Sequence, residues 1–186
     1  MRINFIQNII DVLRGKGTRL FALDFRVKAD NPHWIDSNST FGDYSQMGRH
    51  VNITHSKIGR YCTIGNFVTI GAGEHSIDKI STSFLCISGV KELVKLPLEI
   101  KNDVWIGDDS VIRRGVVVGN CAVVLPNSFV NKDVPDFAVV GGCPAKIIKY
   151  RFDEKTQENI LKSQYWKYEP KKAKSLIKEI MKKNEL

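Results

Sequence analysis

The chain has 186 residues, of which 42% are hydrophobic and 26% charged, with 28 Lys and Arg against 20 Asp and Glu. This length suits one domain with an appendage and is sufficient to enclose a hydrophobic core. The net charge of +8 does not indicate nucleic-acid binding, because no recognition motif accompanies it and the lysines crowd the solvated face of a C-terminal helical pattern. The four cysteines stand singly without a C-x-x-C motif, which favours a reduced, cytoplasmic protein over a disulfide framework.

The sequence pattern of residues 1–34 predicts a short helix over about 3–14, followed by a strand over "RLFALDFRV", in which apolar and polar residues alternate. Ile6, Ile9, Ile10 and Leu13 recur at helical spacing. The apolar run is too short to span a bilayer and lacks a small-residue cleavage site, so we expect neither a transmembrane segment nor a signal peptide. The helix is expected to pack on the domain that follows it, with a position on a membrane surface as the alternative.

The predicted domain of residues 35–150 contains a six-residue repeat that ends near Pro135. This period matches neither a helix face, which recurs at about 3.6 residues, nor a strand face, which recurs at about 2. Eleven hexads begin with an apolar residue, seven of these residues are followed by glycine, and the fifth residue is Ser, Cys, Ala or Val in ten hexads, Glu74 being the exception. The first residues are Phe41, Met47, Ile58, Ile64, Ile70, Ile100, Ile106, Ile112, Val118, Val124 and Val130.

This pattern resembles the hexapeptide repeat of the left-handed parallel β-helix, an all-β fold in which three hexads form one triangular coil. Each short strand is expected to stack on the next coil about 4.8 Å away, with the aliphatic first residue inside the prism and the small fifth residue near a corner. Asn or Asp after the glycine, as at Asn66, Asp108 and Asn120, tolerates the left-handed backbone that a tight corner needs.

The repeat is interrupted over residues 74–99, and a long irregular insertion in a rigid solenoid usually carries function. His75 stands where the repeat breaks. Beyond the repeat, two helical patterns at about 154–163 and 171–183 form a C-terminal extension over residues 151–186. We expect these helices to cap the open end of the coil, whose exposed strand edges would otherwise favour aggregation.

Several motifs together resemble the xenobiotic acetyltransferase branch of the hexapeptide acyltransferases, which includes streptogramin and chloramphenicol acetyltransferases and surface-polysaccharide O-acetyltransferases. The motifs are "NDVWIGDDSVIRRGVVVG" and "GGCPAKIIKYRFDEKTQENIL", after a histidine and "STSF", and the resemblance covers roughly residues 40–168. It implies an acetyl-coenzyme A-dependent acetyltransferase that forms a homotrimer, with each active site between neighbouring prisms and the coenzyme in the groove.

The resemblance assigns His75 as the catalytic base. An alcohol that attacks a thioester must lose a proton, and imidazole, with an ordinary pKa of about 6.5, accepts one at neutral pH. Similar enzymes transfer the acetyl group directly, without an acyl-enzyme. No nucleophile is therefore required, and the sequence has no G-x-S-x-G motif and no cysteine at a suggestive distance from a base.

The same motifs carry the family's coenzyme contacts onto this chain. Trp105 is implied to border the acetyl and pantetheine groups. Pro126 departs from the small residue usual at its position and has no N–H to donate. Lys146 and Lys149 suit phosphate contacts as mobile point charges, with solvated surface lysines as the alternative. The implied coenzyme set is Trp105, Asp108, Pro126, Asn131, Lys132, Lys146 and Lys149.

The acceptor is expected to be a sugar hydroxyl of a surface polysaccharide or its precursor, because the antibiotic-modifying relatives carry a longer insertion after the histidine. An antibiotic acceptor of the streptogramin or chloramphenicol type is the alternative. Tyr44, Asn52, Ser81 and Thr82 are candidates to position the hydroxyl, although Ser81 and Thr82 equally suit turn capping.

Two other classes of function compete with the acetyltransferase. In "HVNITH", His50 and His55 stand five apart, and γ-class carbonic anhydrases build a catalytic zinc site from a similar pair plus a third histidine. The third histidine here would be His75, which follows the pair and lies in the insertion, so we expect no metal. A non-catalytic β-helix scaffold would not need Trp105, His75 and the "PAK" segment together.

Overall fold

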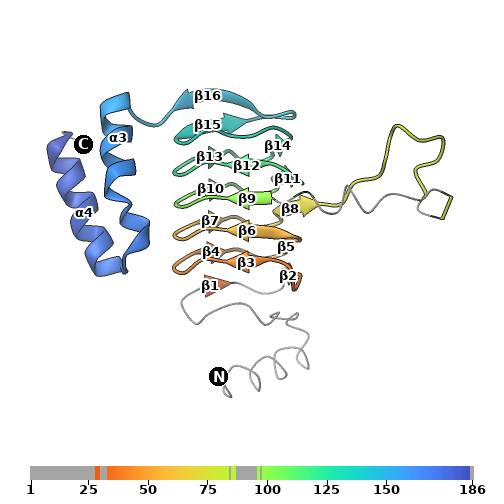
Figure 1. Cartoon of the computed structure of the whole chain (residues 1–186), viewed down its shortest axis with the longest axis horizontal. Coiled ribbons are helices and arrows are strands. Elements are labelled where there is room, and N and C mark those ends of the chain that lie inside the picture. Colours follow the sequence, from red (N-terminus) through yellow and green to blue (C-terminus); the bar gives the residue numbers. More distant parts are fainter. Residues whose placement is uncertain (1–27, 30–32, 84, 87–95, 97, 185–186) are drawn as a thin grey trace, which may run out of the picture.

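The computed structural model describes residues 28–29, 33–83, 85–86, 96 and 98–184. The helix and strand that the sequence predicts within the first 27 residues lie outside the described residues. The described chain winds in turn through three sheets, here called A, B and C, and every strand before β16 pairs in parallel with the equivalent strand of an adjacent coil. The result is a stack of flat coils followed by helices (Figure 1), which confirms the predicted parallel coil with C-terminal helices.

The strands of each sheet lie along one side of a triangular prism. Sheet A consists of β1 (Lys28–Ala29), β4 (Gln46–Met47), β7 (Thr63–Ile64), β10 (Trp105–Ile106), β13 (Val123–Val124), β15 (Ala138–Gly141) and β16 (Lys146–Tyr150). Sheet B consists of β2 (His33–Ile35), β5 (Val51–Ile53), β8 (Thr69–Ala72), β11 (Val111–Arg113) and β14 (Phe129–Val130). Sheet C consists of β3 (Thr40–Phe41), β6 (Ser56–Ile58), β9 (Leu98–Ile100) and β12 (Val117–Val118). We name the corners AB, BC and CA after the sheets that they join.

The first residues of the hexads fill the interior of the prism, as predicted. Ten of the eleven are at most 4% exposed, and Phe41 is partly buried against the same core. The small fifth residues are buried at the corners, where Ser45 donates a hydrogen bond to the Gly59 carbonyl at 3.0 Å. Ile53 is also fully buried, and the slip in the repeat after it shortens the corner that leads into β6.

Close contact between coils explains the glycine that follows the apolar residue. A Cβ atom at Gly59 would lie 2.5 Å from the carbonyl oxygen of Lys101 in the next coil, and one at Gly107 would lie 2.5 Å from the nitrogen of Pro126. Neither glycine has a positive φ. The second position of the hexad is therefore small because the neighbouring backbone occupies the space that a side chain would need.

The expectation that Asn or Asp after the glycine takes the left-handed conformation is wrong. The positive φ falls one residue later, at Phe67 (56°), Asp109 (58°) and Cys121 (57°). Asn66 and Asp108 instead accept hydrogen bonds from the coil below, Asn66 Oδ1 from the Arg49 N–H at 2.9 Å and Asp108 Oδ1 from the Asn66 N–H at 2.8 Å. These side chains extend the inter-coil hydrogen bonding around the corner, where the backbone leaves N–H groups without a strand partner.

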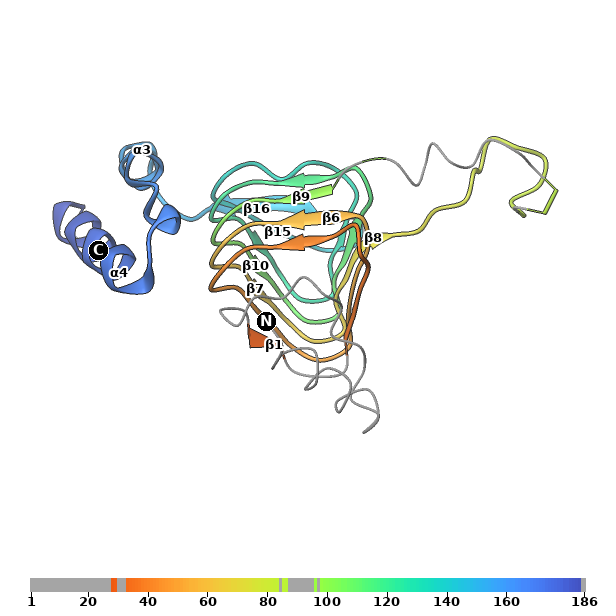
Figure 2. The same cartoon turned by 60° about the horizontal axis from the view of Figure 1, so that its bottom comes forward.

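The C-terminal helices lie along corner CA, so the expectation that they cap the end of the coil is wrong. They are α3 (Glu154–Ser163), the short 3₁₀ helix η1 (Tyr165–Lys167) and α4 (Pro170–Lys183), and Figures 1 and 2 show them beside the stack. Corner CA presents Tyr61, Cys121 and Phe137, which pack with the helices in a second hydrophobic cluster. The edge of β15 is covered by β16, which pairs with it antiparallel.

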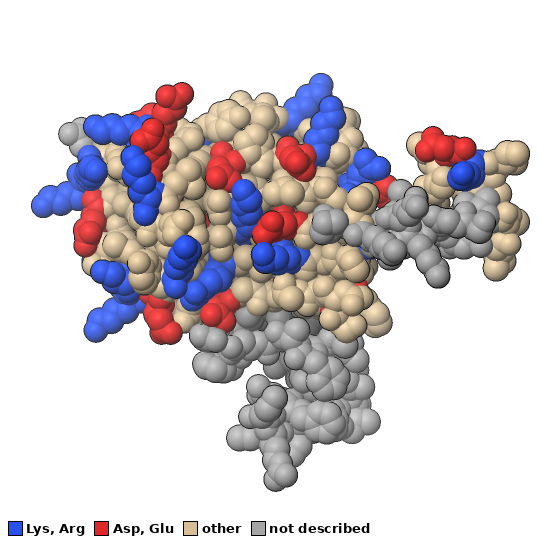
Figure 3. Space-filling model, in the orientation of Figure 1, with Lys and Arg blue, Asp and Glu red and all other residues tan. Residues whose placement is uncertain are grey.

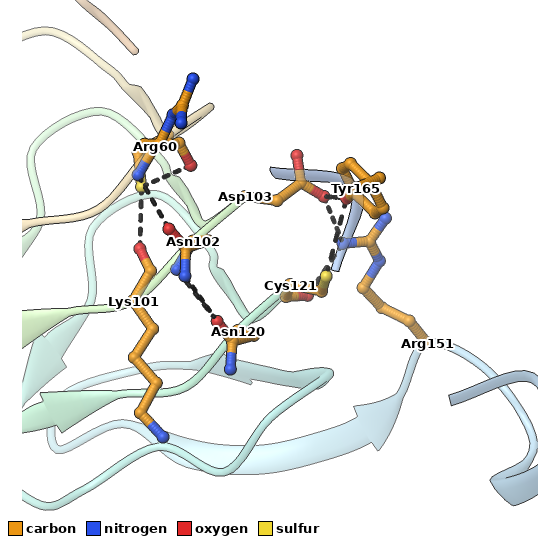
Figure 4. A network of polar contacts seen from close by, with 9 residues as sticks. Arg60, Lys101, Asn102, Asp103, Asn120, Cys121, Arg151 and Tyr165 are labelled. Carbon is orange, nitrogen blue, oxygen red and sulfur yellow. Dashed lines mark hydrogen bonds and ion pairs between the residues drawn. The ribbon is translucent and has the colours of Figure 1, made fainter. Parts of the chain in front are cut away.

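A partly buried polar network ties the helical segment to corner CA (Figure 4). Tyr165 donates its hydroxyl to Asp103 Oδ2, and Arg151 Nη1 donates to the Cys121 carbonyl at 2.8 Å while lying 4.0 Å from the same Asp103 oxygen. Burial is the main reason that the pKa of Asp103 lies above its usual range, and burial raises the pKa of Cys121 to about 12. The network fixes the start of β10, because Asp103 is two residues before Trp105.

The outer face of α4 is basic. Its exposed lysines gather with other Lys and Arg side chains over the C-terminal helices (Figure 3). Ala173 faces the opposite way and is buried in the cluster at corner CA. Among the described helices, none is both long and apolar enough to cross a membrane.

Candidate active site

The insertion, here called the arm, comprises residues 73–97 between β8 and β9. It leaves the prism at corner BC, and its described part projects away from the coils (Figures 1 and 2). Ile77, Ile80 and Leu85 are 88%, 111% and 97% exposed. Apolar side chains of this size are rarely left in water together, so the arm has the character of a segment that packs on another surface.

His75 lies in the first turn of the arm and is exposed. Its Nδ1 atom is 2.6 Å from the backbone carbonyl oxygen of Thr82. Because a carbonyl oxygen only accepts, Nδ1 carries the hydrogen in this contact, and the neutral ring then has Nε2 as its acceptor atom. This arrangement suits a base that takes a proton at Nε2.

The residue before His75 is held by an ion pair from the next coil. Arg113, at the end of β11, contacts Glu74 with two nitrogens, Nε to Oε1 and Nη2 to Oε2, the latter at 2.9 Å. The hydrogen bond from Arg113 is the main cause that lowers the pKa of Glu74. Two parallel N–H···O bonds fix the orientation of both groups more firmly than a single contact does.

On the opposite side of the prism, Trp105 projects from the outer face of sheet A. It is 44% exposed, whereas its neighbour Ile106 is fully buried. Trp105 pairs with Val123 in the next strand, and Val123 pairs with Val139 in the one after. Because residues paired across strands share a face, these three side chains form one apolar strip along sheet A.

Lys149 continues this strip, because it pairs with Val139, and Lys146 pairs with Gly141 on the same face. A regular strand would place residues three apart on opposite faces. The register shift between Val139 and Val140 inserts one extra residue into β16, and this bulge returns both lysines to the outer face of sheet A. Both are exposed.

The other residues of the expected coenzyme set lie at two corners. Asp108 and Pro126 lie at corner AB, where Asp108 contacts the Asn66 N–H and Asn66 Nδ2 with its two carboxylate oxygens. Asn131 and Lys132 follow β14 at corner BC, the corner from which the arm leaves. The set therefore divides into one group on sheet A and corner AB, and another at corner BC, the corner from which the arm with His75 leaves.

Within one chain the two groups do not meet. Corner BC lies across the prism from sheet A (Figure 2), so His75 and Trp105 are separated by the packed core of the coil. A single site that contains both side chains requires two copies of the chain.

The candidate acceptor residues are also dispersed. Tyr44 lies at corner CA, where its ring packs against that of Tyr61 at a centroid distance of 5.0 Å and a tilt of 32°. Asn52 is on the outer face of sheet B, paired with Thr69 in β8. Ser81 Oγ accepts from the Ser83 N–H at 3.1 Å and caps a turn, whereas Thr82 contacts His75 through its backbone carbonyl.

The zinc alternative is not supported by the arrangement of its histidines. His50 lies at corner AB and stacks on Phe67, and His55 lies at corner BC, where its N–H contacts Asp36. The two are at opposite ends of β5 (Val51–Ile53). Within the described part of the chain, no group of three or more His, Cys, Asp or Glu side chains is placed to hold a metal ion.

Comparison with known proteins identifies the family. Residues 97–132 match the family model described as bacterial transferase hexapeptide (six repeats). The chain is 36% identical over 132 residues to a chloramphenicol acetyltransferase of Agrobacterium fabrum, covering 64% of this chain and 63% of that protein. It is 34% identical over 146 residues to a probable macrolide acetyltransferase of Lysinibacillus sphaericus, covering 70% of this chain and 81% of that protein. The chain belongs to the hexapeptide-repeat acyltransferase family.

These names confirm the branch of the hexapeptide-repeat acyltransferases that the motifs indicated. A solved hexapeptide-repeat-containing acetyltransferase of Vibrio cholerae, complexed with acetyl coenzyme A, is 28% identical with a TM-score of 0.57, covering 71% of this chain and 68% of that chain. The chain spans less than two thirds, 63%, of the chloramphenicol acetyltransferase that it matches.

In this hexapeptide-repeat acyltransferase, sequence reasoning missed the residues at the root of the arm. The sequence marks Glu74 as the one charged residue at the fifth position of a hexad. Its partner Arg113, however, is 39 residues away in the chain. Arg114, which is only 8% exposed, occupies a place in the repeat that gave no signal. Only the stacking of β11 on β8 shows that these residues meet.

Proposed function

We propose that this acyltransferase is an acetyl-coenzyme A-dependent O-acetyltransferase that transfers acetyl directly to a hydroxyl of a sugar in a surface polysaccharide or its precursor. It would act in the cytoplasm as a homotrimer of left-handed β-helices. The observation that carries the proposal is the imidazole of His75, whose Nδ1 is engaged by Thr82 and whose Nε2 is thereby the acceptor, presented from an arm that interrupts the repeat.

The outer strip of sheet A fits acetyl-coenzyme A. The pantetheine arm of the coenzyme is extended and largely apolar, and its phosphates are anionic. Trp105, which is 44% exposed, and the half-buried Val123 offer an apolar surface, and Lys149 and Lys146 lie beyond the buried Val139. The two lysines suit phosphate as mobile cations. The bound co-substrate supplies an activated acetyl thioester. We propose that the strip holds it with the acetyl end beside Trp105.

The separation of the two half-sites supports the homotrimer. Corner BC of one prism must meet sheet A of another for His75 to approach Trp105, and three prisms related by a threefold axis satisfy this requirement in a closed ring. The exposed apolar side chains of the arm, Ile77, Ile80 and Leu85, would be covered by the neighbouring copy. In such a ring every copy contributes one half to each of two sites.

His75 would act as general base and then as general acid. Its Nε2 would accept the proton of the acceptor hydroxyl as the oxygen attacks the thioester carbonyl, and would return a proton to the departing sulfur. The Thr82 carbonyl stabilises the ring in the orientation and tautomer that this role needs. A positioned base of this kind contributes about 10²- to 10⁴-fold in rate.

The acceptor has a second candidate, an antibiotic hydroxyl. The relatives named chloramphenicol acetyltransferase and probable macrolide acetyltransferase favour it. The short insertion of residues 74–99 favours the sugar. A panel of chloramphenicol, a macrolide, a streptogramin and nucleotide-linked or oligomeric sugars, assayed by release of free coenzyme A thiol, separates the two candidates.

The enzyme assignment is tested with His75→Ala. Turnover should fall by about 10²- to 10⁴-fold, while affinity for acetyl-coenzyme A and melting temperature stay near wild type, because the side chain is exposed. Where no acceptor of the panel is used, hydrolysis of acetyl-coenzyme A is the substitute readout. A folded variant that retains more than about a tenth of wild-type kcat would remove His75 from the mechanism.

The shared site is tested by mixing two variants, each impaired in one half of the site, at an acetyl-coenzyme A concentration well below the KM of Trp105→Ala. His75→Ala and Trp105→Ala chains, co-refolded in equal amounts, should regain about a quarter of wild-type sites, since half of the sites receive a native His75 and half of those a native Trp105. A site contained in one chain would show no recovery in mixed oligomers.

A further inference from the structure

The root of the arm is held by a pair of charged residues that stands immediately beside the base. Glu74 precedes His75 in sequence and bonds Arg113 through both carboxylate oxygens. The side chains are 24% and 46% exposed, respectively. A solvent-exposed ion pair with a single contact contributes little to stability. A bidentate pair with one partly buried member, however, restrains the orientation of both side chains, and orientation is what matters next to a catalytic side chain.

The ion pair joins the arm to a strand that is hydrogen-bonded on both sides within sheet B. Arg113 ends β11, which lies between β8 and β14 in sheet B. The register of β11 on β8 shifts so that Arg113 faces Ala72, the last residue before the arm. From that position the guanidinium reaches the carboxylate of Glu74, two residues into the arm.

Arg114 holds the preceding turn from inside. It is 8% exposed, and its Nη2 donates to the Gly71 carbonyl at 2.6 Å and contacts Thr54 Oγ1 at 3.0 Å. Thr54 Oγ1 also donates to the Gly71 carbonyl at 2.6 Å. The backbone at Gly71 therefore meets two donors, and the chain enters the arm from a point that is fixed by Arg114 and Thr54.

We propose that Glu74 and Arg113 are positioning residues that hold His75 in its reactive orientation. This proposal rests on the proposed function of His75. The ion pair fixes the backbone one residue before the imidazole, and the contact of Nδ1 with the Thr82 carbonyl closes a loop of the eight residues 75–82. Without the ion pair, the ring loses one of its two restraints and spends less time with Nε2 directed at the acceptor.

The expected effect is confined to turnover. A catalytic group displaced by about 1 Å can lose about 10²-fold in rate, so Glu74→Gln and Arg113→Met should each lower kcat by about tenfold or more. The KM for acetyl-coenzyme A should stay within about twofold, because neither residue lies on sheet A and the loss concerns the transition state alone. Arg113→Lys keeps the charge without the two-point contact and should lose less than Arg113→Met.

A charge exchange separates positioning from the simple effect of a carboxylate near the imidazole. The double variant Glu74→Arg/Arg113→Glu restores an ion pair but reverses the charge beside His75. Positioning predicts recovery to within about threefold of wild-type kcat, with a coupling between the two sites of the kind that double-mutant cycles detect for contacting residues. A field effect of the Glu74 charge predicts no recovery and a shifted pH–rate profile.

The matched control is the Lys57–Glu99 ion pair on sheet C, at 3.1 Å and with side chains 72% and 41% exposed. Lys57→Met removes this ion pair at a position in β6, outside the arm, and should leave kcat unchanged. Melting temperature measured on every variant shows whether lost activity follows lost structure.

A measurement that does not depend on turnover tests the positioning role of Glu74 and Arg113 separately from the proposed acetyl transfer. The chain has four histidines, so ¹⁵N spectra of the imidazoles can report the tautomer of His75 in each variant. The Nδ1–H form should be populated less in Glu74→Gln and Arg113→Met and restored in the charge exchange. Unchanged spectra with unchanged kcat, in a protein that His75→Ala inactivates, would overturn the positioning role. Activity that survives in His75→Ala would instead overturn the proposed function.

Discussion

Replacing Gly59 by alanine tests the explanation of the repeat that the coil packing provides. Gly59 has no positive φ, and at such a position Gly→Ala usually stabilises a protein by about 0.4–1 kcal/mol, because it restricts the unfolded chain. The coil above reverses this expectation. A Cβ atom at Gly59 would lie 2.5 Å from the Lys101 oxygen and 2.7 Å from its carbonyl carbon.

The magnitude follows from the hydrogen bonds that the clash would stretch. A real Cβ contact needs at least 3.0 Å, so the coils must separate there by about 0.5 Å. The Gly59 N–H to Ile100 O and Asp103 N–H to Arg60 O bonds, both 2.8 Å, would then approach 3.3 Å, beyond the usual limit of about 3.2 Å. Weakening two or three such bonds, each worth about 0.5–1.5 kcal/mol, together with the strain of overpacking at about 1–3 kcal/mol, exceeds the gain from the unfolded chain.

We expect Gly59→Ala to lose about 2–4 kcal/mol of stability, which for a chain of this size lowers the melting temperature by about 5–15 °C. The matched control is Gly73→Ala, because a Cβ atom there has nothing within 4 Å, and this variant should melt at or slightly above wild type. Circular dichroism at one protein concentration measures both variants. If Gly59→Ala melted as high as Gly73→Ala, close coil packing would not be the reason for the glycine.

Three further outcomes are expected. Lys146→Ala/Lys149→Ala should weaken acetyl-coenzyme A binding by about 1–3 kcal/mol with saturated turnover unchanged, while Lys174→Ala on α4 should leave binding unaffected; calorimetric titration decides. Trp105→Ala should raise the KM for acetyl-coenzyme A without lowering the melting temperature, since the ring is 44% exposed, and a fall in melting temperature alone would indicate a packing role. Burial raises the pKa of the Asp103 carboxyl group, so the folded chain binds the carboxyl proton more tightly than the unfolded chain does. As the pH rises from about 4 through the raised pKa, the folded chain must give up this proton, and Asp103 lowers the free energy of unfolding. Asp103→Asn should therefore gain in melting temperature relative to wild type between about pH 4 and pH 7; a constant difference would contradict this reasoning.

The interior of the prism was predictable from the sequence because each coil repeats one local environment. An apolar residue every six positions can satisfy a buried interior in a triangular coil, and Ile64, Ile70, Ile106 and Ile112 all lie there, at most 2% exposed. The break in this period also located the arm and His75. A periodic signal survives in the sequence because stacking makes neighbours of residues at regular separation.

The roles of the corner residues were not predictable, because they depend on contacts between coils. Asn66 and Asp108 suggested a left-handed backbone by residue type, but they accept hydrogen bonds from the coil below, and the positive φ passes to Phe67 and Asp109. The C-terminal helices showed an apolar face without showing its partner. That partner is the strip of Tyr61, Cys121 and Phe137 along corner CA, which no local pattern reveals.

For the candidate site too, the sequence indicated the residues and only the tertiary structure showed their arrangement. Residue type and motif selected His75, Trp105, Lys146 and Lys149 as candidates, since an imidazole, an outward-facing aromatic ring and mobile cations suit the proposed acetyl transfer from coenzyme A. Tertiary structure decided how these residues are arranged. A bulge in β16 brings the two lysines to one face of sheet A, and the pairing of β11 with β8 brings Arg113 to Glu74. The packed core of the prism separates His75 from Trp105. The physical reason is that sequence records the side chains, whereas the direction in which each one faces depends on register, bulges and the corner at which the chain turns.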